Sequence, residues 1–211
     1  MPAPSRDTLI LACETLSERD DALATAYALN GLPVWRQAPA KYHTLARTVA
    51  FQQISLAAAG AIWERVVTHF GGLNKLTPQA VLAASDEEIC RCGMSRPKTA
   101  HMKSIAAAMV CGDLSLRRVL KASPIEAKKE LIAVKGIGPW TAEIFLLYSG
   151  RLDAFPTGDI GLMEAYKILR KDDTRLTAKA FSQEAENWRP YRGVAAHLLW
   201  AHFHTLRENR P

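Results

Sequence analysis

Helix-start signals recur along this chain, and they restrict its fold more than any other feature does. Thr77 is followed directly by proline, and Ser85 and Ser123 each stand three residues before a glutamate. A serine or threonine with glutamate three residues later forms a capping box, and a proline just after a cap fits the first turn of a helix. These signals predict that most of the chain is helical.

Apolar residues between the signals repeat with helical spacing. Helices are predicted over residues 42–50, 57–70, 97–109, 124–134, 139–148, 160–170 and 177–188, with a last one around 194–201. No segment alternates apolar and polar residues over the length of a strand. The predicted fold class is therefore all-α, with about nine or ten helices.

The composition bounds the class of protein. With 211 residues, 48% of them hydrophobic, the chain fits one large domain or two small lobes that share a core. It has no apolar run near the roughly 18 residues of a membrane-spanning helix and no signal-peptide layout, so we expect a cytoplasmic protein without membrane contact. Its 27 basic and 21 acidic residues give a net charge of +6. That charge suits a nucleic-acid partner as well as it suits a merely basic protein.

The cysteines are Cys13, Cys90, Cys92 and Cys111. Only Cys90 and Cys92 lie close together in sequence, and no second pair complements them. A structural zinc site needs about four ligands at suitable spacing. We therefore expect reduced thiols, with neither zinc nor an iron–sulfur cluster.

A glycine-rich turn, Val134-Lys135-Gly136-Ile137-Gly138, separates two helical patterns in the segment VKGIGPWTAEIF. Glycine serves where φ must be positive or where the backbone must approach another surface closely. The amides after the turn lie at the start of the next helix, where the helix dipole favours a phosphate group. This pattern fits phosphate binding and an ordinary turn between helices equally well.

Asp159 lies further along, in the turn-rich stretch LDAFPTGDIGL. The commonest role of an aspartate in this setting is to cap a helix. A capping carboxylate can also face a cleft, where it stabilises positive charge that develops during a reaction.

Taken together, these segments resemble the helix–hairpin–helix, Gly/Pro-rich, aspartate superfamily of DNA base-excision glycosylases. VKGIGPWTAEIF and AFPTGDIGL carry the resemblance, FQQISLAAAGAIW is similar to the segment whose loop probes the duplex, and NWRPYRGVAAHLLW is similar to a late helix. Over about residues 45–205 the chain most resembles the AlkA-type 3-methyladenine DNA glycosylases. It resembles a compact form, without the N-terminal mixed α/β domain of longer members. No cysteine follows Cys111 to form the iron–sulfur cluster of the endonuclease III branch.

The resemblance implies that Asp159 is the catalytic aspartate. It would stabilise an oxocarbenium-like sugar as the damaged base departs, and help to position water. Asp153 lies outside the matching position, and we interpret it as a solvated loop residue. Trp140 occupies the position at which bifunctional members carry a Schiff-base lysine, which implies a monofunctional enzyme that leaves an abasic site.

The resemblance also implies a base pocket. Trp140 would stack on the electron-poor ring of an alkylated purine. Trp200 matches a second pocket tryptophan, and Ile144 stands where some relatives carry a tyrosine. For each tryptophan the alternative is plain helix packing, and the isoleucine leaves the range of lesions open.

A base inside a duplex must be flipped out before an enzyme can act on it. Gln53, with Gln52 and Ile54 beside it, matches the loop that would fill the gap left in the duplex. The simpler alternative is a pair of surface glutamines in a loop.

At the turn, the resemblance implies DNA phosphate binding by Lys135, Gly136, Ile137 and Gly138. It also implies a monovalent cation, Na⁺ or K⁺, on the backbone carbonyls of Ile132, Val134 and Ile137. No other cofactor is expected. The implied partner is double-stranded DNA with alkylated bases such as 3-methyladenine, bound by a monomer that acts on the nucleoid.

The expected architecture is two helical lobes with the active-site cleft between them. One lobe spans residues 41–151, with the helix–hairpin–helix at 131–145, and the other combines residues 1–40 with 152–211. Two other functions stay open. One is a DNA-damage-binding module without chemistry, against which the retained Asp159 argues, and the other is a glycosylase of this fold for another lesion such as hypoxanthine.

Overall fold

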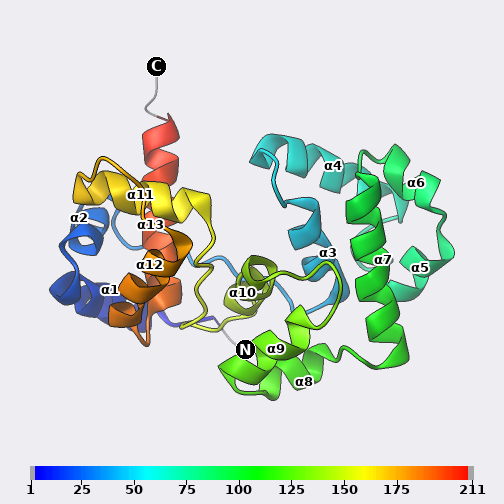
Figure 1. The fold of residues 1–211 in the computed structure, drawn as a ribbon, viewed down its shortest axis with the longest axis horizontal. Coiled ribbons are helices and arrows are strands. Elements are labelled where there is room, and N and C mark those ends of the chain that lie inside the picture. The colour runs from blue at the N-terminus through cyan, green and yellow to red at the C-terminus, as the bar shows by residue number, and fades with distance from the viewer. Residues whose placement is uncertain (1–2, 209–211) are drawn as a thin grey trace. The chain divides into compact units, whose positions relative to one another are not determined.

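Every regular element in the computed structural model, which describes residues 3–208, is a helix (Figure 1). The all-α prediction is confirmed. The described residues form thirteen α-helices and one 3₁₀ helix, more than the nine or ten predicted. One reason is that α8 (Leu116–Lys121) has six residues, too few to show a helical repeat in sequence. Another is that the predicted helix over 177–188 is divided into α12 (Ala178–Glu184) and the 3₁₀ helix η1 (Ala185–Trp188).

The chain divides into two compact units. The first unit runs up to Ala38 and resumes at Leu146, and it contains α1 (Arg6–Arg19), α2 (Asp21–Asn30), α11 (Ile160–Arg170), α12, η1 and α13 (Arg192–Glu208). The second unit, Pro39–Phe145, contains α3 (Tyr42–Ala50), α4 (Leu56–His69), α5 (Pro78–Ala83), α6 (Asp86–Arg91), α7 (Arg96–Cys111), α8 and α9 (Pro124–Ile132). The second boundary falls inside α10 (Pro139–Tyr148), earlier than the predicted residue 151.

Side-chain caps account for where most helices begin. Ser85 and Ser123 form complete capping boxes, in which Glu88 and Glu126 bond back to the cap residues. The Thr77 hydroxyl accepts a bond from the amide three residues on. Each cap satisfies amide groups that have no partner within the helix, so the signals identified in sequence set these boundaries.

Aromatic rings fill the core of the first unit, where α13 packs against α2 and α11. Phe155, Tyr166, Phe181 and Trp188 lie with ring centroids 5.2–5.8 Å apart. Asp20 caps α2 with one carboxylate oxygen, and its other oxygen accepts from the Tyr166 hydroxyl and the Trp188 indole, each at 2.9 Å. One half-buried carboxylate thereby joins α2, α11 and η1.

Helix α7 is the centre of the second unit, and α3, α5 and α6 pack against it. Its residues Met102 and Ile105 are fully buried, and the buried Tyr42 hydroxyl donates to the Met102 carbonyl at 2.9 Å. Two segments that contain predicted site residues contact this helix: the turn after α3 and the hairpin between α9 and α10. Their positions within the unit therefore depend on α7.

Candidate active site

The hairpin between α9 and α10 is held tightly against α7. Gly136 has φ +96°, and a Cβ placed there would lie 2.5 Å from the Cβ of His101. The Ile137 side chain is 3% exposed, and its amide donates to the Val134 carbonyl at 3.0 Å. Only glycine fits at residue 136, because both the positive φ and the contact exclude a side chain.

The outer side of the hairpin is open. Lys135 and Gly138 are exposed, and a Cβ added at Gly138 would meet nothing within 4 Å. The Gly138 carbonyl accepts from the Ala142 amide at 3.0 Å, which starts α10. This side therefore combines a free approach to the backbone, a lysine, and the positive end of a helix dipole.

Helix α10 carries two of the predicted pocket residues. Trp140 is half-buried in its first turn, and Ile144 is buried one turn later. The first turn, Pro139–Glu143, contains no lysine. It therefore offers no amine for a Schiff base.

The turn Phe51–Ser55, between α3 and α4, contains the predicted duplex wedge. Gln53 is exposed and has φ +55°, in the left-handed region, and Ile54 is 39% exposed. Gln52 differs from Gln53 and Ile54, because its side chain is half-buried and bonded within the protein. Its amide nitrogen donates to the Thr141 hydroxyl at 2.8 Å and lies 3.4 Å from the Gly136 carbonyl. Gln52 therefore ties the turn to the hairpin.

Asp159 lies in the first unit, at the start of α11. One of its carboxylate oxygens accepts from the Leu162 amide at 3.0 Å and from the Trp200 indole N–H at 3.3 Å. The side chain is half-buried. Gly161 leaves space beside it, since a Cβ there would lie 3.2 Å from the same oxygen. The carboxylate is thus both a helix cap and an acceptor group held in place by N–H donors on a half-buried side chain.

An aromatic cluster surrounds Trp200 within the same unit. Trp200 is 8% exposed and lies 6.3 Å from the Tyr148 ring and 5.5 Å from the His197 ring. Trp35 stacks on His197 at 4.4 Å. Sequence reasoning missed Trp35, His197 and Tyr148 as neighbours of the site, because no local spacing links a loop residue such as Trp35 to α13.

His197 is neutral within this cluster. Its Nδ1 lies 2.7 Å from the Gly193 carbonyl, and its Nε2 accepts from the Arg36 amide at 3.2 Å. These two bonds fix the tautomer with the proton on Nδ1. Burial lowers the pKa of His197 to about 4, so at neutral pH it adds no charge beside Trp200.

The interpretation of Asp153 as a solvated loop residue is wrong. Its carboxylate accepts two bonds from Arg192, both at 2.9 Å, and it also pairs with Arg189. Glu186 binds the same two arginines. Asp153 therefore holds the chain before Asp159 to the start of α13, which is a structural role.

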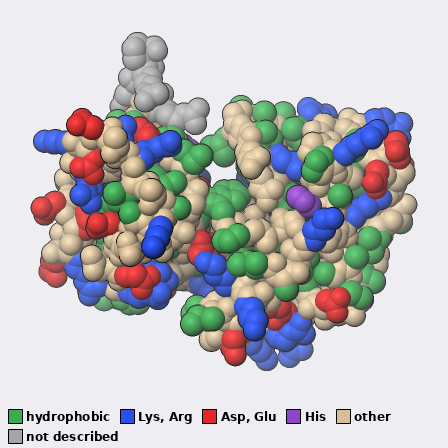
Figure 2. Space-filling view, viewed as in Figure 1, with side chains coloured by type: hydrophobic (Ala, Val, Ile, Leu, Met, Phe, Trp, Pro, Cys, Tyr) green, Lys and Arg blue, Asp and Glu red, His purple; other side chains and the backbone are tan. Residues whose placement is uncertain are grey.

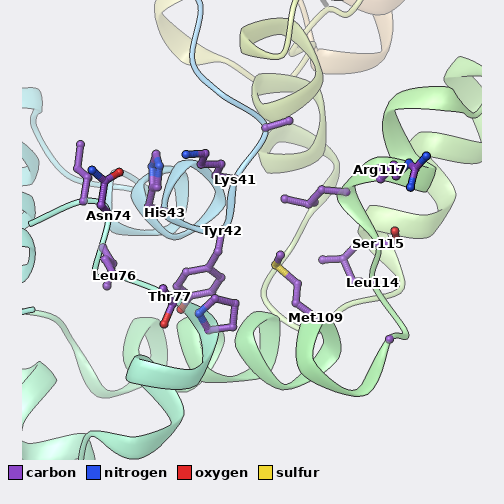
Figure 3. A pocket seen from close by; sticks show the side chains of 15 residues that line it. Lys41, Tyr42, His43, Asn74, Leu76, Thr77, Met109, Leu114, Ser115 and Arg117 are labelled. Carbon is purple, nitrogen blue, oxygen red and sulfur yellow. The ribbon is translucent and has the colours of Figure 1, made fainter.

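A pocket of about 630 Å³ lies elsewhere in the second unit, lined by residues of the α3 and α8 starts and of the loop before α5 (Figure 3). Lys41, His43 and Arg117 bring basic groups to it, but none of the predicted site residues lines it. Figure 2 shows further Lys and Arg side chains over α8 and α9.

Other features bear on cofactors and membranes. Cys13, Cys90, Cys92 and Cys111 are free thiols, and burial raises the pKa of Cys13 to about 11. Within residues 3–208, no cluster of three or more His, Cys, Asp or Glu side chains is arranged to hold a metal ion. In the same part of the chain, no helix has the length and apolar character needed to cross a membrane.

Several known proteins with similar sequences are named DNA-3-methyladenine glycosylases. The chain is 28% identical over 172 residues to the DNA-3-methyladenine glycosylase of Bacillus subtilis, covering 77% of this chain and 57% of that protein. It is 32% identical over 161 residues to DNA-3-methyladenine glycosylase 1 of Schizosaccharomyces pombe, covering 75% of this chain and 71% of that protein. The chain thus spans little more than half of the first relative and more than two thirds of the second.

A solved structure has the same fold. The 3-methyladenine DNA glycosylase of Schizosaccharomyces pombe, in complex with abasic DNA, superposes with a TM-score of 0.80 at 29% identity, covering 90% of this chain and 94% of that chain. Residues 46–190 match the model of the HhH-GPD superfamily of base excision DNA repair proteins. This match includes the Phe51–Ser55 turn, the hairpin and Asp159, and the chain belongs to that superfamily.

Proposed function

We propose that this protein is a monofunctional DNA glycosylase that hydrolyses the N-glycosidic bond of alkylated purines, such as 3-methyladenine, in double-stranded DNA. The observation that carries the proposal is the Asp159 carboxylate, held by two N–H donors at the start of α11 and still half-exposed. Relatives named as 3-methyladenine glycosylases support the substrate class.

Asp159 acts on the sugar in this proposal. Departure of the base leaves positive charge on the sugar ring, and a fixed carboxylate stabilises that charge without having to reorganise. The Trp200 indole and the Leu162 amide both donate to the carboxylate and hold it in place. The same group accepts a proton or a hydrogen bond from the attacking water.

Trp140 gives the reaction its monofunctional character. Without an amine in the first turn of α10, no covalent link to the sugar forms, so the product is an abasic site. The indole instead recognises the base, since an alkylated purine carries positive charge that an aromatic face attracts. Ile144, one turn later in α10, adds buried apolar surface, and Trp200 holds the Asp159 carboxylate.

The second unit provides the DNA-binding surface. Gln53, with Ile54 beside it, enters the duplex where the base has been flipped out, while Gln52 stays bonded to the hairpin. Lys135 and the backbone at Gly136 to Gly138 bind a phosphate. The cost of unstacking a base, about a few kcal/mol, is offset by these contacts and by the pocket.

We further propose that a monovalent cation binds backbone carbonyls of the hairpin. Ile132 ends α9, where helix carbonyls have no partner within the helix. The Val134 carbonyl accepts one bond, from Ile137, and a carbonyl oxygen has a second lone pair. These carbonyls, with that of Ile137, would hold Na⁺ or K⁺, whose positive charge would add to the attraction for a phosphate.

Release of 3-methyladenine from methylated duplex DNA tests the proposed activity. Asp159→Asn keeps an acceptor for Leu162 and Trp200 and removes the charge, so we expect base release to fall by at least about 10²-fold with DNA binding retained. Asp173→Asn removes an exposed carboxylate from the same unit and should leave the rate unchanged.

Three results would change the assignment. Full activity of Asp159→Asn would exclude Asp159 as the catalytic group. Tight binding of methylated DNA by the wild-type protein without release of any base, including hypoxanthine from a lesion panel, would indicate a binding module. A covalent adduct with abasic DNA after borohydride treatment would show lyase chemistry despite Trp140.

A further inference from the structure

The turn Phe51–Ser55 adopts a conformation that its sequence does not favour. Gln53 has φ +55°, and Lys171 is the one other non-glycine residue with positive φ within the described residues. A residue with a side chain pays for this left-handed conformation, and an isolated loop would leave it often. Something outside the turn must therefore hold Gln53 in place.

Lys98 makes the contacts that do this. It lies in the first turn of α7, and its ammonium donates to the Ala50 carbonyl at 2.9 Å and to the Gln52 carbonyl at 2.7 Å. Ala50 is the last residue of α3, so its carbonyl is one that a helix leaves without an internal partner. Gln52 directly precedes Gln53, so Lys98 fixes the peptide group that leads into the left-handed residue.

The Lys98 ammonium is partly withdrawn from water. The side chain is half-buried, and burial lowers its pKa. A desolvated ammonium binds carbonyl oxygens more strongly than a hydrated one does, because the local dielectric is lower. Lys98 thus links α7 to the Phe51–Ser55 turn through hydrogen bonds that are partly shielded from water.

Two further contacts hold the turn on either side of these carbonyls. Gln52 donates to the Thr141 hydroxyl at 2.8 Å, and the Arg47 guanidinium lies 4.1 Å from the centre of the Phe51 ring. Together with Lys98, they fix Phe51 and Gln52 and leave Gln53 and Ile54 as the exposed residues. The anchored part and the exposed part of the turn are adjacent in sequence.

We propose that Lys98 is a positioning residue for base flipping, which holds Gln53 in its left-handed conformation before DNA arrives. This inference rests on the proposed function, in which Gln53 enters the duplex. A wedge that is already ordered loses less conformational entropy on insertion than a flexible one, so more of the binding energy remains to unstack the base.

A double-mutant cycle tests this role. Single-turnover release of 3-methyladenine from methylated duplex DNA is measured for Lys98→Met, Gln53→Ala and the double variant. We expect the release rate of each single variant to fall on the order of tenfold or more. The rate of the double variant should fall no further than that of the slower single variant. Two residues that act through one wedge are not additive. If the rate loss in the double variant equals the product of the two single-variant losses, the proposal is wrong.

Two variants control for charge and for folding. Lys103→Met removes a lysine from the same helix that pairs with Asp86 at 2.5 Å, and it should leave the rate unchanged. An equal loss in Lys103→Met would show a general effect on the unit and overturn the proposal. Lys98→Arg keeps a cation with several donors and should restore most of the activity. Lys98→Arg can also be tested if Lys98→Met folds poorly. If Lys98→Arg folds but does not restore activity, that result counts against the proposal.

A second measurement separates this proposal from the catalytic one. Fluorescence of 2-aminopurine placed opposite an abasic-site analogue reports unstacking without chemistry. Wild-type protein should raise the signal, and Lys98→Met and Gln53→Ala should each reduce the rise, even if no base is released from any substrate. An unchanged rise in Lys98→Met would refute positioning. The salt dependence of binding should also be unchanged in Lys98→Met, since a fall of about one in its slope would indicate a phosphate contact instead.

Discussion

At the residue scale, several side chains of this protein have two roles at once. Asp159 caps α11 and presents a carboxylate, and Trp200 packs in α13 while its indole donates to that carboxylate. His197 supports the same cluster by being neutral, with both ring nitrogens bonded to backbone. At these positions the packing interpretation is therefore compatible with the proposed functional one.

His197 gives the first unit a pH-dependent stability. Its pKa is lowered to about 4 from an ordinary 6.5, so between these values the unfolded chain binds a proton that the folded chain does not. Its contribution to stability is full above about pH 6.5 and is lost as the pH falls toward about 4. We expect the free energy of unfolding to drop by about 2 kcal/mol from this group between pH 7 and pH 5.

Urea unfolding at the two pH values measures this drop. His197→Gln should remove that part of the pH dependence, whereas His69→Gln, at an exposed position, should keep it. Equal pH dependence in the wild type and His197→Gln would show that His197 is not the titrating group.

At the element scale, the hairpin shows which features sequence predicts and which it does not. The pattern of two glycines predicts a tight turn, and the capping boxes and Asp159 predict helix starts, because these depend on neighbours within three or four residues. The two glycines differ in a way that the pattern hides. Gly136 is required by φ and by His101 of α7, whereas Gly138 has open space beside it.

Substitution of the two glycines separates stability from DNA binding. Gly136→Ala should cost roughly 2–4 kcal/mol of unfolding free energy, since it adds a disfavoured backbone conformation to a clash with His101. Gly138→Ala should cost well under 1 kcal/mol and should weaken DNA binding, because the methyl group would block the proposed contact between a phosphate and the backbone. Thermal melts and binding to an abasic-analogue duplex measure both. Equal melting temperatures for the two variants would contradict this distinction.

At the scale of the whole molecule, the second unit is an insertion in the sequence of the first. The predicted site residues are divided accordingly, with Asp159 and Trp200 in one unit and Trp140, the hairpin and the wedge turn in the other. The net charge of +6 belongs to the whole chain, and it favours association with a polyanion at any part of the basic surface.

The logarithm of the binding constant for duplex DNA should therefore fall linearly with the logarithm of the salt concentration. The slope should be about −0.9 for each phosphate that the protein neutralises. Lys135→Met should reduce the slope by about one, and Lys179→Met, an exposed lysine of the first unit, should leave it unchanged. Fluorescence anisotropy measured between about 50 and about 300 mM salt gives the slopes. No change in Lys135→Met would remove Lys135 from the phosphate contacts.

The sequence by itself determined the helical class, most helix starts, the turn with its two glycines and the identity of the aspartate at the start of α11. These depend on local spacing, or on motifs that keep their order along the chain. Tertiary structure decided that Lys98 reaches the Gln52 carbonyl across 46 residues, that Gln52 bonds to Thr141, and that Trp35 stacks on His197. It also decided that Asp153 is an ion-pair anchor. Such contacts join helices distant in sequence, and the packing of those helices fixes which polar groups meet.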